Sequence, residues 1–148
     1  MNAQKRFLYV YGTLRAHTRH RIHDELMKRF RLLGRGYANA ELFDLGVYPG
    51  IIFPPTGDGR RTTGEVYELN SDNMAESWAA LDEYEGCGPD DPRPHLYERR
   101  LIPIQLEDGR KVEAWTYTLT YLPGWAVPIP GGDYLTWSRS NADEAALV

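Results

Sequence analysis

The chain has 148 residues, a length typical of one domain, and 42% hydrophobic with 26% charged residues is an ordinary globular composition. The net charge of -4, with lysine and arginine scattered along the chain, argues against nucleic acids and anionic membranes as partners. We therefore expect a single domain over residues 1–148, with a loosely ordered tail over about residues 138–148.

The single cysteine, Cys87, excludes an internal disulfide and a CxxC zinc site. The apolar run that follows Lys5-Arg6 is too short for a secretory signal, and no stretch approaches the ~20 apolar residues of a membrane span. A lone thiol also suits a reducing compartment. We therefore expect a cytoplasmic protein.

The first half of the chain predicts short strands separated by turns, with one helix. Residues 7–11 are an unbroken apolar run, which is typical of a buried strand, and Gly12 follows. Residues 20–33 predict a helix that ends at Gly34, because four apolar residues share one helical stripe: Ile22, Leu26, Phe30 and Leu33. Further strands are predicted at residues 37–43, 51–53 and 62–69.

The second half predicts a helix over about residues 72–85, where Asn73 and Glu76 resemble a capping box and Gly86 suits the residue after the helix. Residues 97–106 and 111–119 predict a hairpin, because Asp108-Gly109 lies between them. A short helix is predicted near residues 133–137. Strands outnumber helices without regular alternation, so we expect an α+β fold whose strongly twisted mixed sheet curls into a small barrel flanked by two main helices.

The helix over residues 72–85 directs one carboxylate inward. Its apolar stripe consists of Met74, Trp78 and Leu81. Glu85 continues this stripe four residues after Leu81, whereas Asp82 lies on the flank and Glu83 on the opposite face. Burial and the negative end of the helix dipole both raise a carboxyl pKa, which suits a general acid/base. The structural alternative is that Glu85 pairs with an arginine such as Arg99, or reaches solvent as the helix end frays.

A second candidate site is the loop Tyr11-Gly12-Thr13-Leu14, where the first strand ends. Glycine allows a sharp turn with positive φ and a close approach by a ligand. Successive backbone N–H groups in such a turn can bind a carboxylate. The alternative is an ordinary strand end at a glycine turn.

Five short motifs, in order, resemble one known family. They are Phe7-Leu8-Tyr9-Val10-Tyr11-Gly12-Thr13-Leu14, Gly64-Glu65-Val66-Tyr67, Leu81-Asp82-Glu83-Tyr84-Glu85-Gly86, Tyr97-Glu98-Arg99 and Ala114-Trp115-Thr116-Tyr117. The series resembles the gamma-glutamylcyclotransferase-like superfamily, in particular the branch of gamma-glutamylamine cyclotransferases and plant avirulence-induced-like proteins. The resemblance covers roughly residues 7–120. The loop over residues 87–95 contains three prolines and varies in length within the family, and the region after Tyr121 follows the family pattern only loosely.

The resemblance implies a cavity in which the backbone of Tyr11, Gly12, Thr13 and Leu14 holds the α-carboxylate of a substrate. It implies that Glu85 is the catalytic residue. Two further candidate pocket residues are Arg99 and Tyr117.

The implied reaction is the intramolecular cyclisation of a small gamma-glutamyl compound to 5-oxoproline, with release of an amine or amino acid. It requires no metal and no organic cofactor. The leaving group and the oligomeric state stay open. The alternative is a non-catalytic member of the same fold that binds a small ligand or a protein, for which Trp125 in a Pro/Gly-rich segment is a candidate contact.

Other polar residues are weaker candidates. The spacing of His17, His20 and His23 suits a metal, but no pair of carboxylates is spaced to complete the site, and a solvated helix face is favoured. Cys87 has no histidine placed to activate it, so an unreactive loop thiol is favoured. The remaining aromatic residues of the motifs are expected in the core or the pocket wall: Tyr67, Tyr97, Trp115 and Tyr117.

Overall fold

The computed structural model describes residues 6–12, 28–46, 48–57, 59–70 and 74–137. Its largest part is a closed barrel in the strand order β1-β5-β2-β6-β7. The strands are β1 (Phe7–Val10), β2 (Phe30–Ala38), β5 (Thr62–Leu69), β6 (Tyr97–Leu106) and β7 (Lys111–Leu119). Neighbouring strands are antiparallel except β1 and β7, which pair in parallel where Leu8 lies opposite Trp115. This mixed, closed sheet confirms the expected α+β class and the barrel.

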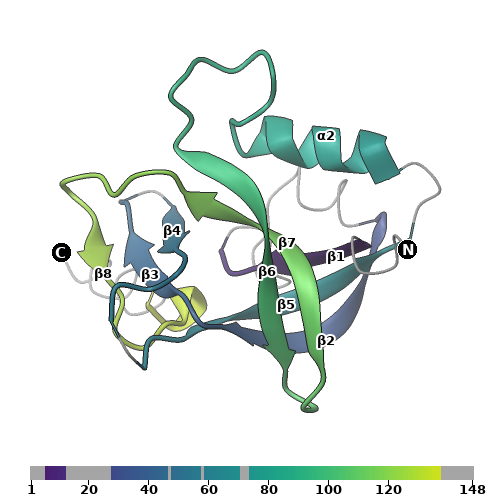
Figure 1. Ribbon diagram of the computed structural model, residues 1–148, viewed down its shortest axis with the longest axis horizontal. Coiled ribbons are helices and arrows are strands. Elements are labelled where there is room, and N and C mark those ends of the chain that lie inside the picture. The colour runs from purple at the N-terminus through teal and green to yellow at the C-terminus, as the bar shows by residue number, and fades with distance from the viewer. Residues whose placement is uncertain (1–5, 13–27, 47, 58, 71–73, 138–148) are drawn as a thin grey trace, which may run out of the picture.

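A second sheet lies beside the barrel, at the left of Figure 1. Its order is β4-β3-β8, from β3 (Glu41–Asp44), β4 (Pro49–Ile52) and β8 (Val127–Pro128). The single strand predicted over residues 37–43 is therefore two strands in different sheets. The chain leaves the barrel after Ala38, where Ala40 is fully buried and its carbonyl accepts the Thr62 hydroxyl at 3.0 Å.

The helix predicted over residues 20–33 is wrong at its C-terminal end, and residues 20–27 lie outside the described part of the chain. Phe30 begins β2 and pairs with Leu69 of β5. Its ring lies against Trp78, with centroids 5.9 Å apart, while Leu32 is exposed. Gly34 does not end a helix but follows a shift in the β2–β5 register. An apolar spacing of three or four residues misled the prediction, because long-range pairing decides this segment.

The helix α2 (Met74–Tyr84) lies across the barrel at the top of Figure 1. Trp78 and Leu81 are buried in a cluster with Leu8 and Val10 of β1, so the predicted stripe does face the sheet. Alternate residues of β1, such as Tyr9, belong to a second cluster to which every barrel strand contributes and which contains no residue of α2. This second cluster joins the barrel to the second sheet, because Leu42 of β3 and Ile51 of β4 also belong to it. The proposed cap residue Asn73 lies outside the described residues.

Two smaller predictions are confirmed. The β6–β7 hairpin turns through Asp108-Gly109, where Gly109 has a φ of 96°. A single helical turn covers residues 134–137, and the Trp137 N–H donates to the Asp133 carbonyl at 3.1 Å. The expected tail over residues 138–148 lies outside the described residues. Within those residues, no helix has the length and apolar character to cross a membrane.

Candidate functional site

A cavity of about 570 Å³ opens where the ends of β1 and α2 meet the starts of β4 and β6. Six tyrosines dominate its described wall: Tyr9, Tyr11, Tyr48, Tyr84, Tyr97 and Tyr117. Glu85 is the only charged side chain among these lining residues. The others that complete the wall are uncharged: Val10, Gly12, Pro49, Gly86, Leu96 and Thr116. The volume suits a small molecule.

Glu85 lies on this wall because of the way α2 ends. The Glu85 N–H still donates to Leu81 at 2.9 Å, so Glu85 completes the last turn on the buried stripe. Gly86 then takes a φ of 74°. Its N–H donates to the Glu83 carbonyl at 3.1 Å, and the Cys87 N–H donates to the Asp82 carbonyl at 2.9 Å. This pair of bonds is the Schellman motif, which favours glycine at its left-handed position. The expected role of Gly86 is confirmed, and the helix does not fray at Glu85.

The Glu85 carboxyl has no hydrogen bond or ion pair with any other described residue. Burial, reinforced by the negative charge of Asp82, raises the pKa of Glu85 to about 7. Both effects disfavour the ionised form. A carboxyl with this pKa is divided between its acid and base forms near neutral pH, and it can therefore accept and return a proton.

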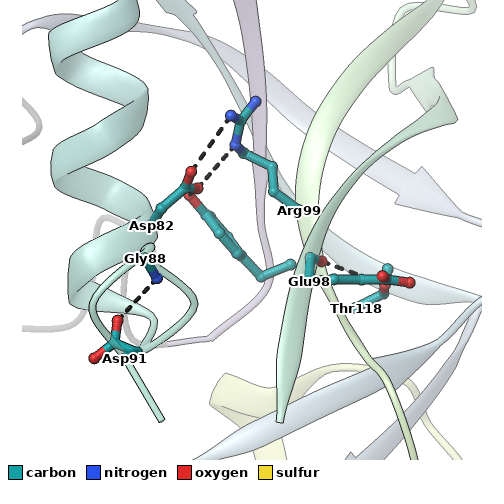
Figure 2. A network of polar contacts seen from close by, with 7 residues as sticks. Asp82, Gly88, Asp91, Glu98, Arg99 and Thr118 are labelled. Carbon is teal, nitrogen blue, oxygen red and sulfur yellow. Dashed lines mark hydrogen bonds and ion pairs between the residues drawn. The ribbon is translucent and has the colours of Figure 1, made fainter. Parts of the chain in front are cut away.

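Arg99 does not pair with Glu85 and is not among the described lining residues, although the sequence left both roles open. Its Nε donates to Oδ1 of Asp82 at 2.8 Å and its Nη2 to Oδ2 at 3.4 Å, as Figure 2 shows. The Tyr117 hydroxyl donates to the same Oδ1 at 2.7 Å. Arg99 thus joins β6 to the end of α2, and Tyr117 lies between this pair and the cavity.

Hydrogen bonds hold the buried tyrosines by their hydroxyl groups. Tyr11 donates to the Tyr117 carbonyl at 2.5 Å, Tyr9 to the Thr62 carbonyl at 2.8 Å, and Tyr97 to the Pro49 carbonyl. Burial raises the pKa of Tyr11, Tyr97 and Tyr117 well above the ordinary value of a phenol. Since the Tyr9, Tyr11 and Tyr97 hydroxyls already donate to protein carbonyls, these residues can offer a ligand only their oxygen lone pairs and their rings.

Gly12 lies against Pro49. A Cβ at Gly12 would come within 2.6 Å of Pro49 Cγ, so only glycine fits here without displacing the ring. Gly12 needs close approach and does not use a positive φ, in contrast to one of the sequence-based expectations. Thr13 and Leu14, the other predicted binding residues, lie outside the described part of the chain.

The turn between β3 and β4 carries Tyr48 and Pro49 into the wall, and the C-terminal segment holds this turn in place. The Trp125 indole N–H donates to the Leu45 carbonyl at 3.1 Å. The Trp137 indole N–H donates to the Asp44 carboxylate at 2.7 Å. The region after Tyr121 therefore supports the wall from behind and supplies none of its described lining residues.

The other candidates separate from the site. Burial raises the pKa of the Cys87 thiol to about 12, so the reactive thiolate is strongly disfavoured. Within the described ranges, no group of three histidine, cysteine, aspartate or glutamate residues is arranged to hold a metal ion. His17, His20 and His23 lie outside those ranges. The loop over residues 87–95 closes on itself, with the Gly88 N–H bonded to Asp91 at 2.8 Å (Figure 2), and contributes no described lining residue.

The sequence profile of the family described as gamma-glutamyl cyclotransferase, AIG2-like matches residues 8–136 of the chain. This chain belongs to that family. The match spans all the strands of the barrel except the first residue of β1, and it includes Tyr11, Gly12 and Glu85.

Similar proteins agree with the gamma-glutamyl cyclotransferase, AIG2-like assignment. The Methanocaldococcus jannaschii protein named "Putative gamma-glutamylcyclotransferase MJ1514" is 27% identical over 131 residues, which are 86% of this chain and 94% of that protein. The crystal structure of an AIG2-like protein from Mus musculus has a TM-score of 0.61 at 27% identity and covers 80% of each chain. Bacillus subtilis YkqA shares the fold, with a TM-score of 0.64 at 22% identity; the match covers 90% of this chain and 42% of YkqA.

Sequence reasoning missed the Tyr48-Pro49 part of this family member's cavity wall and the partners of Asp82, which is not itself among the described lining residues. Asp82 was placed on the helix flank, but its partners Arg99 and Tyr117 come from strands 17 and 35 residues away. Tyr48 and Pro49 appeared only as a turn. A signal for Asp82 was present in its position three residues before Glu85, on an adjoining face of the same helix.

Proposed function

We propose that this protein is an enzyme that cyclises a small gamma-glutamyl compound to 5-oxoproline and releases an amine or amino acid. The observation that carries the proposal is the Glu85 carboxyl, which lines the cavity beside Tyr11 and Gly12 with a pKa of about 7 and no cationic partner among the described residues. Family membership supports the same class of reaction.

The substrate carries its own nucleophile. The α-nitrogen attacks the γ-carbonyl carbon, a new C–N bond closes a five-membered ring, and the C–N bond to the leaving amine breaks. Two protons leave the α-ammonium and two reach the leaving nitrogen, which departs as an ammonium ion. Glu85 takes the first proton as a carboxylate and returns it as a carboxylic acid, an exchange typically worth ~10²–10⁴-fold in rate.

The rest of the cavity selects a conformation of the substrate. Ring closure is intramolecular, so holding the α-nitrogen close to the γ-carbonyl supplies several kcal/mol of the barrier. The loop that begins at Tyr11-Gly12 and continues through Thr13 and Leu14 holds the α-carboxylate in this proposal. In this proposal the leaving group lies against the rings of Tyr48 and Tyr97, which both line the cavity and whose centroids are 6.1 Å apart. No step requires a metal ion or an organic cofactor.

The test is 5-oxoproline release from a panel of gamma-glutamyl amines, gamma-glutamyl amino acids and glutathione. Glu85→Gln keeps the shape of the side chain and removes the base, so we expect a loss of 10²-fold or more in kcat/KM. Glu83→Gln is the matched control, because Glu83 is exposed on the same helix. Equal turnover by wild type and Glu85→Gln rejects the catalytic role of Glu85. A folded protein that binds members of the panel and turns over none is instead a binding protein.

A further inference from the structure

We propose that Asp82 is the positioning residue of the Glu85 site, where its carboxylate anchors the end of α2 and presents a fixed negative charge to the Glu85 carboxyl. This inference rests on the proposed function, since it assigns a second residue to the same acid/base group. Asp82 precedes Glu85 by three residues, and the two therefore lie on adjoining faces of the helix end.

Three donors from the barrel hold the Asp82 carboxylate. Oδ1 accepts the Arg99 Nε–H at 2.8 Å and the Tyr117 hydroxyl at 2.7 Å, and Oδ2 accepts Arg99 Nη2 at 3.4 Å. Figure 2 shows Asp82 reaching from α2 toward Arg99 on the adjacent strand. Bidentate contacts of this kind fix both position and orientation. The last turn of α2, and Glu85 with it, is therefore anchored to β6 and β7.

Arg99 is itself fixed by aromatic packing. Its guanidinium carbon lies 4.6 Å from the centroid of the Trp115 ring and 5.2 Å from that of Trp78. Side-chain exposure is 24% for Arg99 and 21% for Asp82, which separates this pair from the freely solvated ion pairs that contribute little. Screening by solvent is weak here, so the charge of Asp82 remains effective at Glu85.

No other described group around Glu85 supplies a fixed negative charge. The other titratable groups that line the cavity or interact electrostatically with Glu85 are phenols and one thiol: Tyr9 and Tyr11 at the end of β1, Tyr48 before β4, Tyr84 of α2, Tyr97 of β6, Tyr117 of β7 and Cys87. Burial raises the pKa of Tyr11, Tyr97, Tyr117 and Cys87, so these four are uncharged near pH 7. Among the described residues, the charge that acts on Glu85 is then that of Asp82, which its partner Arg99 partly offsets.

Asp82 and Arg99 therefore shift the pKa of Glu85 in opposite directions. Removing the negative charge of Asp82 favours ionisation of Glu85 and leaves the Arg99 cation to favour it further. Removing the Arg99 cation leaves the Asp82 charge unopposed and disfavours ionisation of Glu85. A purely structural salt bridge makes a different prediction, because loss of either partner would lower stability without moving the titration of Glu85 in opposite senses.

The experiment is the titration of the Glu85 side-chain carboxyl by carbon-13 NMR in the full chain, which requires no turnover. In Asp82→Asn we expect the Glu85 pKa to fall by about one unit, a roughly tenfold change in its acid dissociation constant. Asparagine keeps the Oδ1 that accepts both short hydrogen bonds. In Arg99→Gln we expect the Glu85 pKa to rise, and in the exposed control Glu83→Gln we expect it to match the wild type.

The inference is overturned if the Glu85 pKa in Asp82→Asn equals the Glu85 pKa in the control Glu83→Gln. If Asp82→Asn fails to fold, Arg99→Gln decides, and an unchanged or lowered Glu85 pKa in that variant overturns it. The acid limb of kcat/KM for a turned-over gamma-glutamyl compound should move with the NMR titration. A shifted titration in a protein that turns over nothing supports the positioning role while rejecting the proposed function. If turnover depends on Glu85 but the Glu85 pKa is unshifted in Asp82→Asn, the proposed function is supported and the positioning role of Asp82 is rejected.

Discussion

Arg99 forms an ion pair with Asp82 and not with Glu85, which lies three residues after Asp82. Glu85 therefore has no cationic partner among the described residues. A cation beside Glu85 would stabilise its carboxylate and lower its pKa. The placement of Arg99 therefore preserves a carboxyl that titrates near neutrality. It also shows that the structural alternative for Glu85, an ion pair with Arg99, is wrong.

The pH dependence of turnover should reflect this carboxyl. If Glu85 acts first as a base, kcat/KM falls as pH decreases through its pKa, and we expect an acid limb with an apparent pKa of about 7. The measurement is the rate of 5-oxoproline release from pH 5 to pH 9 with an accepted substrate. An acid limb near the ordinary glutamate value of 4.5 would contradict the assignment.

The free energy of unfolding should also depend on pH through the raised pKa of Glu85. The folded pKa of Glu85 is about 7 and the ordinary value is 4.5. Below pH 4.5 the carboxyl is protonated in both states. Between these values the folded state holds a proton that the unfolded state has lost, so the free energy of unfolding decreases as pH rises and then levels off above pH 7. We expect Glu85 to contribute a total decrease of about 3 kcal/mol.

Glu85→Gln isolates that contribution, because glutamine cannot titrate. Urea denaturation of both proteins at pH 4.5, 6 and 8 gives the difference in unfolding free energy at each pH. The wild type should lose stability relative to Glu85→Gln as pH rises over this range. A difference that stays constant would show that the Glu85 pKa is not raised in the folded protein.

Gly12→Ala tests the contact between the β1 loop and the β3–β4 turn. The new Cβ would come within 2.6 Å of Pro49 Cγ, so the ring or the loop must move, and we expect a loss of about 1–3 kcal/mol in unfolding free energy. Gly124→Ala is the control, because a Cβ there meets no atom within 4 Å and Gly124 does not have positive φ. Equal effects of the two substitutions would contradict the tight contact.

Tyr11→Phe removes one hydroxyl and leaves the ring in the cavity wall. The buried Tyr117 carbonyl then loses the donor that lies at 2.5 Å, and we expect the free energy of unfolding to fall by about 1–3 kcal/mol. The control is Tyr48→Phe on the same wall, because Tyr48 is 42% exposed and its change should stay within ~0.5 kcal/mol. Urea denaturation of the two variants provides the comparison, and a neutral Tyr11→Phe would be the contrary result.

The parts of this fold that local periodicity determines could be predicted from the sequence. The stripe through Trp78 and Leu81 located the buried face of α2 and directed Glu85 inward, where the structure has it lining the cavity. Asp108-Gly109 located the β6–β7 hairpin, because this turn chemistry acts over a few residues.

Long-range contacts determine the rest, and no local pattern contains them. Phe30 fits a helical stripe as well as a strand, and pairing with Leu69 selects the strand. Barrel closure depends on a parallel contact between Leu8 and Trp115, which are far apart in the sequence. The charge environment of Glu85 likewise depends on which of two neighbouring carboxylates Arg99 reaches, and spacing alone did not decide this.

The tryptophans Trp125 and Trp137 support the wall turn without lining the cavity. The acid/base carboxyl and the shape of the entrance at Tyr48 are therefore encoded in separate stretches of chain. Substitutions within residues 121–137 can tilt or loosen this turn while α2 and β1 keep their geometry. For the proposed cyclisation, altering this supporting segment is thus a route to changing which leaving groups fit while Glu85 stays in place.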